Sequence, residues 1–263
     1  MSLFDFTKDY ITPASNRANW FGRSFPTLRF YATVFRIVQW SSGLAKKGRY
    51  DDAAWIRASQ WSLSAIEAIG GTVSVENTAV LRSFEKPAVF IANHMSTLET
   101  FALGGIIGPQ KPVTFIVKKS LVEYPFFKHA MRALNPIVVG RTNPREDLVT
   151  VLEGGEQRLR SGRSIIVFPQ TTRTTEFNPA EFNSIGVKLA RRADVPVVPV
   201  AIRSDAWGNG SWIKEFGPIR PSLPVHFAFG TPLKVTGNGK GEHDQVIAFI
   251  ADKLTLWGLK PKA

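Results

Sequence analysis

Residues 88–100, AVFIANHMSTLET, join a short apolar run to a histidine and a glutamate. The run at 88–92 has the length and composition of a buried strand. Titratable side chains are an unusual end for such a strand. Where the chain turns into a helix over 97–107, just after His94, the carboxylate of Glu99 comes near the imidazole ring. The stretch therefore predicts a strand, a turn with a functional histidine, and a helix.

Beyond residue 71, runs of β-branched and apolar residues alternate with helical patterns. This alternation predicts an α/β fold with a mostly parallel central sheet flanked by helices, and nearly apolar strands are expected where helices cover both faces. The predicted strands are 72–76, 88–92, 113–117, 137–140, 164–168, 195–202 and 225–230. The predicted helices are 97–107, 120–133, 144–161, 182–192 and 244–257.

Residues 1–70 form a predicted N-terminal helical region, and residues 71–263 form the α/β domain. Within the first region, residues 51–69 have the pattern of a helix that ends at a glycine pair. The segment 25–40 is rich in aromatic residues and arginines, and it falls short of the roughly 20 apolar residues that a membrane span needs. Two interpretations of this segment stay open: a helix in a membrane interface, or a helix packed on the protein's own core.

Composition narrows the class of protein. The 263 residues are 44% hydrophobic and 21% charged, as in ordinary globular proteins. The absence of cysteine excludes disulfides, thiolate metal sites and cysteine nucleophiles. A net charge of +12 predicts attraction to an anionic membrane, a nucleic acid or an acidic carrier protein. The first ten residues lack a basic-then-apolar run, so no secretory signal is expected.

Basic and polar residues follow several predicted strands. In an open α/β sheet, ligands bind beyond the carboxyl ends of the strands, and arginine and lysine there suit a phosphate group. The segments are NHMSTLE (93–99), KKS (118–120), RTNPR (141–145), PQTTRT (169–174) and RSD (203–205). The histidine and the cations are therefore expected to converge on one edge of the sheet.

The chemistry expected at this edge is general-base catalysis. Glu99 can accept a hydrogen bond from one ring nitrogen of His94, which leaves the other nitrogen as a base. The chain has no G-x-S-x-G nucleophile elbow, and Ser96 and Thr97 are too close in sequence to present their hydroxyls to the ring. We therefore expect a substrate hydroxyl as nucleophile, without a covalent enzyme intermediate.

Four segments in order resemble the conserved blocks of the glycerolipid acyltransferase family, of the lysophosphatidic acid acyltransferase type. NHMSTLE resembles the family's N-H-x-x-x-x-D/E signature, and VFPQTTRT (167–174) resembles its F-P-E-G-T-R-S block. VVGRTN (138–143) lies where the second block carries an arginine for the acceptor phosphate. VPVVPVAI (195–202) is similar to the fourth block. The ordered set spans roughly residues 85–205.

The resemblance implies an O-acyltransferase in phospholipid biosynthesis or remodelling. It would move a fatty acyl group from acyl-CoA or acyl-carrier protein to a lysophospholipid hydroxyl, with lysophosphatidic acid as the expected acceptor. His94 would be the general base, and Glu99 would orient it. The implied acceptor phosphate-binding residues are Arg141, Arg173 and Lys119, and the implied substrate-binding residues are Asn93, Gln170, Thr171 and Thr172. No cofactor beyond the acyl donor and no metal is implied, and His129, His226 and His243 lack ligand spacing.

Two residues depart from the family's third block: Gln170 replaces a glutamate, and Thr171 replaces a glycine. These changes leave a non-standard acceptor, such as a lyso-aminolipid, as an alternative. Thioester hydrolysis and catalytically altered, peripheral lipid binding are two others, and nucleic-acid binding rests on charge alone. The expected partners are the lysophospholipid, the acyl donor and an anionic membrane surface. The expected location is peripheral or monotopic on the cytoplasmic face of a membrane.

Overall fold

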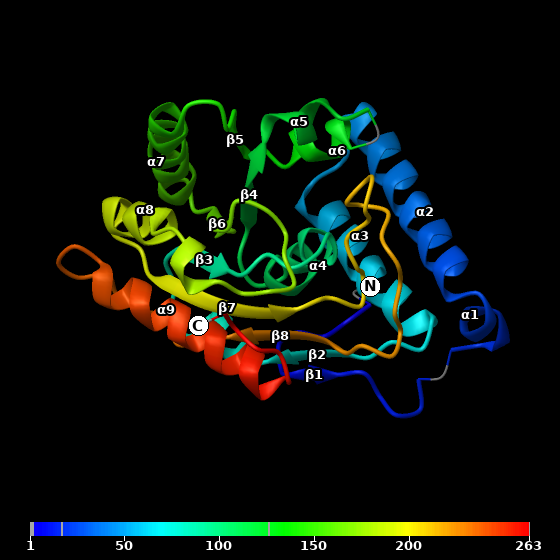
Figure 1. Ribbon diagram of the computed structural model, residues 1–263. Coiled ribbons are helices and arrows are strands. Elements are labelled where there is room, and N and C mark those ends of the chain that lie inside the picture. Colours follow the sequence, from blue (N-terminus) through cyan, green and yellow to red (C-terminus); the bar gives the residue numbers. More distant parts are fainter. Residues whose placement is uncertain (1–2, 17, 126, 263) are drawn as a thin grey trace.

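A computed structural model describes residues 3–16, 18–125 and 127–262. Within them, eight strands form one sheet in the order β1-β2-β8-β7-β3-β6-β4-β5 (Figure 1). The strands are β1 (Tyr10–Ile11), β2 (Val73–Glu76), β3 (Val89–Ala92), β4 (Val113–Lys118), β5 (Ile137–Val139), β6 (Ser164–Val167), β7 (Val197–Arg203) and β8 (Val225–Phe229). The helices are α1 (Trp20–Ser24), α2 (Pro26–Lys46), α3 (Asp52–Ala68), η1 (Thr78–Arg82), α4 (Leu98–Ile107), α5 (Lys119–Glu123), α6 (Lys128–Ala133), α7 (Pro144–Arg160), η2 (Pro179–Glu181), α8 (Ile185–Ala193) and α9 (Lys240–Leu256).

The sheet is mostly parallel, which confirms the predicted fold class. Only the pairs β1–β2 and β7–β8 are antiparallel among the described strands. Each predicted strand is present, with bounds within two residues of those expected. The short strand β1 was not predicted, because two residues carry no detectable period.

Alternate side chains of the central strands enter two separate cores. In β3, Phe90 packs in the core that also holds residues of α3 and α4, whereas Val89 and Ile91 pack in the core beneath α7, α8 and α9. Successive strand residues point to opposite faces, so a strand with helices on both sides must be apolar throughout. Figure 1 shows these helices on the two sides of the sheet.

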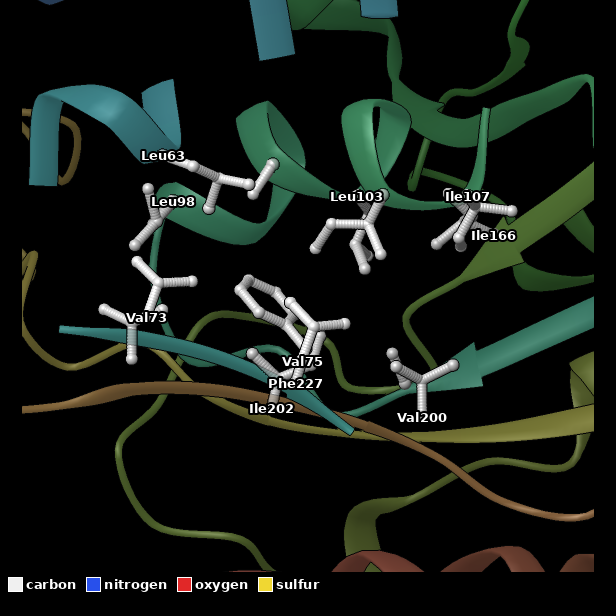
Figure 2. Close-up of a cluster of buried hydrophobic side chains, with 14 of the residues drawn as sticks. Leu63, Val73, Val75, Leu98, Leu103, Ile107, Ile166, Val200, Ile202 and Phe227 are labelled. Atoms are coloured by element: carbon white, nitrogen blue, oxygen red, sulfur yellow. The ribbon is translucent and has the colours of Figure 1, made fainter. Parts of the chain in front are cut away.

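The helix that follows the histidine turn is fixed by its apolar side chains. Leu98, Leu103 and Ile107 of α4 point toward the sheet, where Val75 and Val200 lie in the same core (Figure 2). All three of these leucine and isoleucine side chains are fully buried. Helix α4 therefore has little freedom to move relative to the sheet, and its first turn is held at the carboxyl edge.

Helix α4 also lies very close to α3. A Cβ atom built on Gly104 would lie 2.4 Å from the Trp55 ring, so glycine is required at that position. The helices of residues 1–70 thus share a core with the sheet, and Phe30 of α2 and Leu63 of α3 are both fully buried in it.

The segment 25–40 forms most of α2, which continues to Lys46. One face of the helix packs inward through Phe30, Val34 and Ile37, while Leu28 and Phe35 are more than half exposed. The inward face therefore bears out packing on the protein's own core, and contact of the exposed face with a membrane stays a prediction. None of the helices among the described residues is long and apolar enough to cross a membrane.

The prediction of one helix over 120–133 is wrong. Two short helices, α5 and α6, replace it, and residue 126 between them lies outside the described residues. Tyr124 is extended, with φ −63° and ψ 123°, because Pro125 disfavours helical backbone in the residue before it. The last helix also starts earlier than predicted, at Lys240.

Candidate active site

His94 lies in the turn between β3 and α4, at the carboxyl edge of the sheet. Its Nδ1 is 3.1 Å from Oε1 of Glu99, and its ring stacks on Phe168 with centroids 4.2 Å apart. Because a carboxylate only accepts hydrogen bonds, Nδ1 carries the proton and donates it to Glu99. The other nitrogen, Nε2, is then the one that can accept a proton from a substrate.

Glu99 is fully buried and surrounded by hydrogen-bond donors. Oε1 accepts from the backbone N–H groups of Met95 (2.5 Å) and Ser96 (2.7 Å). Oε2 accepts from the hydroxyls of Ser96 (3.0 Å) and Ser204 (2.5 Å). Burial by itself raises the pKa of this carboxyl, but hydrogen bonds from His94, Ser204 and Ser96 and the charge of His94 outweigh it and lower the pKa. Glu99 is therefore the charged partner that a base needs.

Asn93 ties the turn between β3 and α4 to the neighbouring strand β7. Its side-chain amide donates to the carbonyl of Ile202 and accepts from the N–H of the same residue, both at 2.8 Å. The side chain is buried and does not line the cavity at the site. The structure thus places Asn93 against β7, and the predicted contact with substrate has no geometric support.

Gln170 holds the turn from the other side. Its side-chain oxygen accepts from the backbone N–H of His94 at 2.6 Å, and the carbonyl of His94 accepts from the N–H of Thr174 at 3.0 Å. A glutamate at position 170 could accept the same hydrogen bond. The departure from the family's third block therefore keeps this contact and removes a negative charge.

Arg141 follows β5 in a left-handed backbone conformation, with φ +60°. Such a conformation is uncommon for arginine, and Asp147 in α7 holds it by accepting from the N–H groups of Arg141 (2.8 Å) and Gly140 (2.9 Å). The guanidinium donates to the carbonyl of Thr171, which connects the second and third blocks. Asp147 was not singled out in the sequence.

Arg173 is held by two residues of other segments. One nitrogen donates to the hydroxyl of Thr97, and Nη2 is 2.6 Å from the carboxylate of Glu215. The hydroxyl of Thr172 accepts from Nζ of Lys214 at 2.6 Å. Lys214 and Glu215 belong to the loop between β7 and β8, which carries no periodic sequence signal.

These side chains open onto one cavity of about 1070 Å³. Its polar wall includes His94, Lys118, Arg141, Gln170, Thr171, Thr172, Arg173, Lys188, Lys214 and Glu215. Its apolar wall includes Ile37, Val38, Trp55, Phe101, Phe115, Leu121 and Met131. The structure therefore brings the imidazole and both arginines into one cleft, with a large apolar space beside them.

Lys119 is not in this cavity. Its Nζ lies 3.8 Å from Glu123 on the exposed side of α5, and the neighbouring Lys118 lines the wall instead. Among the described residues, no group of three or more histidine or acidic side chains is placed to hold a metal ion.

Residues 72–203 match the family described as Acyltransferase. The chain is 32% identical over 205 residues to the 1-acyl-sn-glycerol-3-phosphate acyltransferase of Pseudomonas aeruginosa, covering 77% of this chain and 73% of that protein. It is 36% identical over 120 residues to the protein of that name from Saccharomyces cerevisiae, covering 45% of this chain and 39% of that protein.

A solved structure, the 1-acyl-sn-glycerophosphate (LPA) acyltransferase PlsC from Thermotoga maritima, matches with a TM-score of 0.63. The match covers 92% of this chain and 98% of that chain at 20% identity, and it shows a shared fold. The sheet thus has the α/β fold of that structure. The matched residues make the assignment specific: the chain belongs to the acyltransferase family, and it is an acyltransferase.

Proposed function

We propose that the protein transfers a fatty acyl group from a thioester donor, acyl-CoA or acyl-carrier protein, to the free hydroxyl of lysophosphatidic acid. One observation carries the proposal. His94, paired with the buried Glu99, opens into a cavity that has both cationic and apolar walls. The relatives from P. aeruginosa and S. cerevisiae bear the name of this activity.

In the proposed reaction, Nε2 of His94 takes the proton of the acceptor hydroxyl. The hydroxyl oxygen then forms a bond to the thioester carbonyl carbon, and the carbon–sulfur bond breaks as the intermediate collapses. The leaving thiolate takes the proton back from Nε2, so the base is regenerated without a covalent enzyme intermediate. The Glu99 carboxylate stabilises the imidazolium that exists between the two proton transfers.

The acceptor phosphate is assigned to Arg141 and Arg173. Both guanidinium groups line the same cavity as His94, and guanidinium matches a phosphate through paired hydrogen bonds. Lys119 is replaced in this proposal by Lys118, because only the latter reaches the cavity wall.

The apolar part of the cavity suits the hydrocarbon chain of the substrates. Its walls come from α2, α3, α4, β4 and the two short helices after β4. Exposed aromatic and aliphatic side chains on α1, on α2 and at the residue between them, with the net charge of +12, support attachment to the surface of an anionic membrane. The exposed side chains are Trp20, Phe21, Phe25, Leu28 and Phe35. We place this attachment on the cytoplasmic face.

The proposal is tested with purified protein, anionic vesicles and a panel of lysolipids, each supplied with acyl-CoA and with acyl-carrier protein. Products are identified by mass spectrometry. We expect His94-dependent formation of diacylated phosphatidic acid. Faster transfer to a lyso-aminolipid than to lysophosphatidic acid would show that the lyso-aminolipid is the acceptor. Consumption of the donor without any lysolipid would show that the protein is a thioesterase.

A further inference from the structure

The loop between β7 and β8 reaches back over the active-site cavity. Figure 1 shows this golden segment running beside α2. The loop is anchored through its backbone: the indole of Trp207 donates to the carbonyl of Glu215 at 3.1 Å, and the hydroxyl of Tyr31 donates to the carbonyl of Gly217 at 2.6 Å. Neither of these two hydrogen bonds uses the side chain of Glu215, so both can persist when that side chain leaves Arg173.

The carboxylate of Glu215 binds one terminal nitrogen of Arg173, the arginine that the proposed function assigns to the acceptor phosphate. It lies 2.6 Å from Nη2 of Arg173, and both residues line the cavity. The other terminal nitrogen of Arg173 is engaged by Thr97. A phosphate that binds Nη2 of Arg173 is therefore repelled by a carboxylate of like charge at the same nitrogen.

We propose that Glu215 is an internal competitor for the acceptor: its carboxylate leaves Arg173 when the acceptor phosphate binds, and it thereby lowers the affinity for the acceptor. The inference rests on the proposed function and adds a residue that tunes the same site. The exchange is chemically simple because one anion replaces another on one guanidinium, while the anchored loop stays in place.

The exchange leaves each charged group with a partner or with water. The Glu215 side chain is 30% exposed and that of Arg173 is 15% exposed, so the released carboxylate has water within reach. Arg173 keeps an anionic partner throughout the exchange, and a phosphate carries more charge than a carboxylate. Lys214, which donates a hydrogen bond to Thr172 at the cavity wall, remains beside the bound phosphate.

The test compares Glu215→Gln with Glu85→Gln, which removes the same charge from an exposed residue just before β3, at the opposite edge of the sheet. The measurements are the KM for lysophosphatidic acid at saturating donor and the inhibition constant of glycerol 3-phosphate. We expect both to fall by about two- to fivefold in Glu215→Gln relative to the control. Glu215→Ala should change them in the same direction.

A simple orienting role for Glu215 predicts the opposite sign. If the carboxylate serves only to position Arg173, its loss raises the KM for the acceptor. A raised KM, or one equal to that of the control, therefore overturns the inference. Thermal melts of both variants show whether the fold is intact.

A double-mutant comparison locates the effect. In an Arg173→Ala background, Glu215→Gln should no longer lower the acceptor KM, because the two side chains then have nothing to compete for. An undiminished effect in that background overturns the inference. Failure of the wild-type protein to acylate lysophosphatidic acid is a separate result: it overturns the proposed function and the role of Glu215 with it.

Discussion

The hydroxyl of Ser204 donates a 2.5 Å hydrogen bond to Oε2 of Glu99, although the two residues are 105 positions apart in the chain. Both side chains are fully buried. Ser204 directly follows β7 and Glu99 lies in the first turn of α4, so the carboxylate that faces His94 is held both from the end of β7 and from the turn after β3.

Ser204→Ala tests this contact. We expect a lower kcat with little change in either KM, and a loss of about 1–3 kcal/mol in the free energy of unfolding, because a buried carboxylate loses a donor. The acid limb of the pH–rate profile should move to higher pH, since a hydrogen bond that lowers the pKa of Glu99 is gone. Ser204→Thr, which keeps the hydroxyl, should restore the profile. An unchanged profile in the alanine variant would contradict this positioning role.

The lowered pKa of Glu99 also predicts a pH-dependent stability. Because the folded-state pKa lies below the unfolded value, the charged carboxylate contributes its full stability above the unfolded pKa, roughly 4.3. The contribution is lost as the pH falls through the lower, folded-state pKa. The difference in melting temperature between the wild type and Glu99→Gln should therefore be largest near neutral pH and shrink toward pH 3. A difference that grows on acidification would contradict a charged Glu99.

Arg141→Ala should act on the acceptor. We expect the KM for lysophosphatidic acid to rise about tenfold or more, since a charge-assisted hydrogen bond to phosphate is lost, while the donor KM stays near the wild-type value. Arg145→Ala is a matched control, because Arg145 is exposed on the same edge but does not line the cavity. A change confined to the KM for the acyl donor would show that Arg141 does not bind the acceptor phosphate.

Local patterns were enough to predict the sheet and the histidine turn. The strand at 88–92 is marked by its unbroken apolar run, a helix follows it directly, and the five-residue spacing of His94 and Glu99 places the pair without knowledge of the rest of the fold. The break at Pro125 is also encoded locally, because the residue before proline avoids helical backbone, although the apolar pattern over 120–133 predicts one uninterrupted helix.

The partners that complete the site could not be predicted. Ser204 was expected at this edge as part of RSD (203–205), but its contact with Glu99 spans 105 positions. Glu215 reaches Arg173 across 42 positions, from a loop without periodicity. The sequence also carried no signal for which of two adjacent lysines, Lys118 or Lys119, lines the cavity. β4 ends at Lys118, which faces the cavity, and the next residue begins α5 and points to solvent.

The central claim is that Nε2 of His94 is the general base. The most direct measurement is kcat for His94→Ala at saturating lysophosphatidic acid and acyl donor, with vesicle binding measured in parallel. We predict a kcat at least ~10²-fold below that of the wild type and unchanged vesicle binding, because only the proton transfer is lost. Wild-type turnover in this variant would contradict the account.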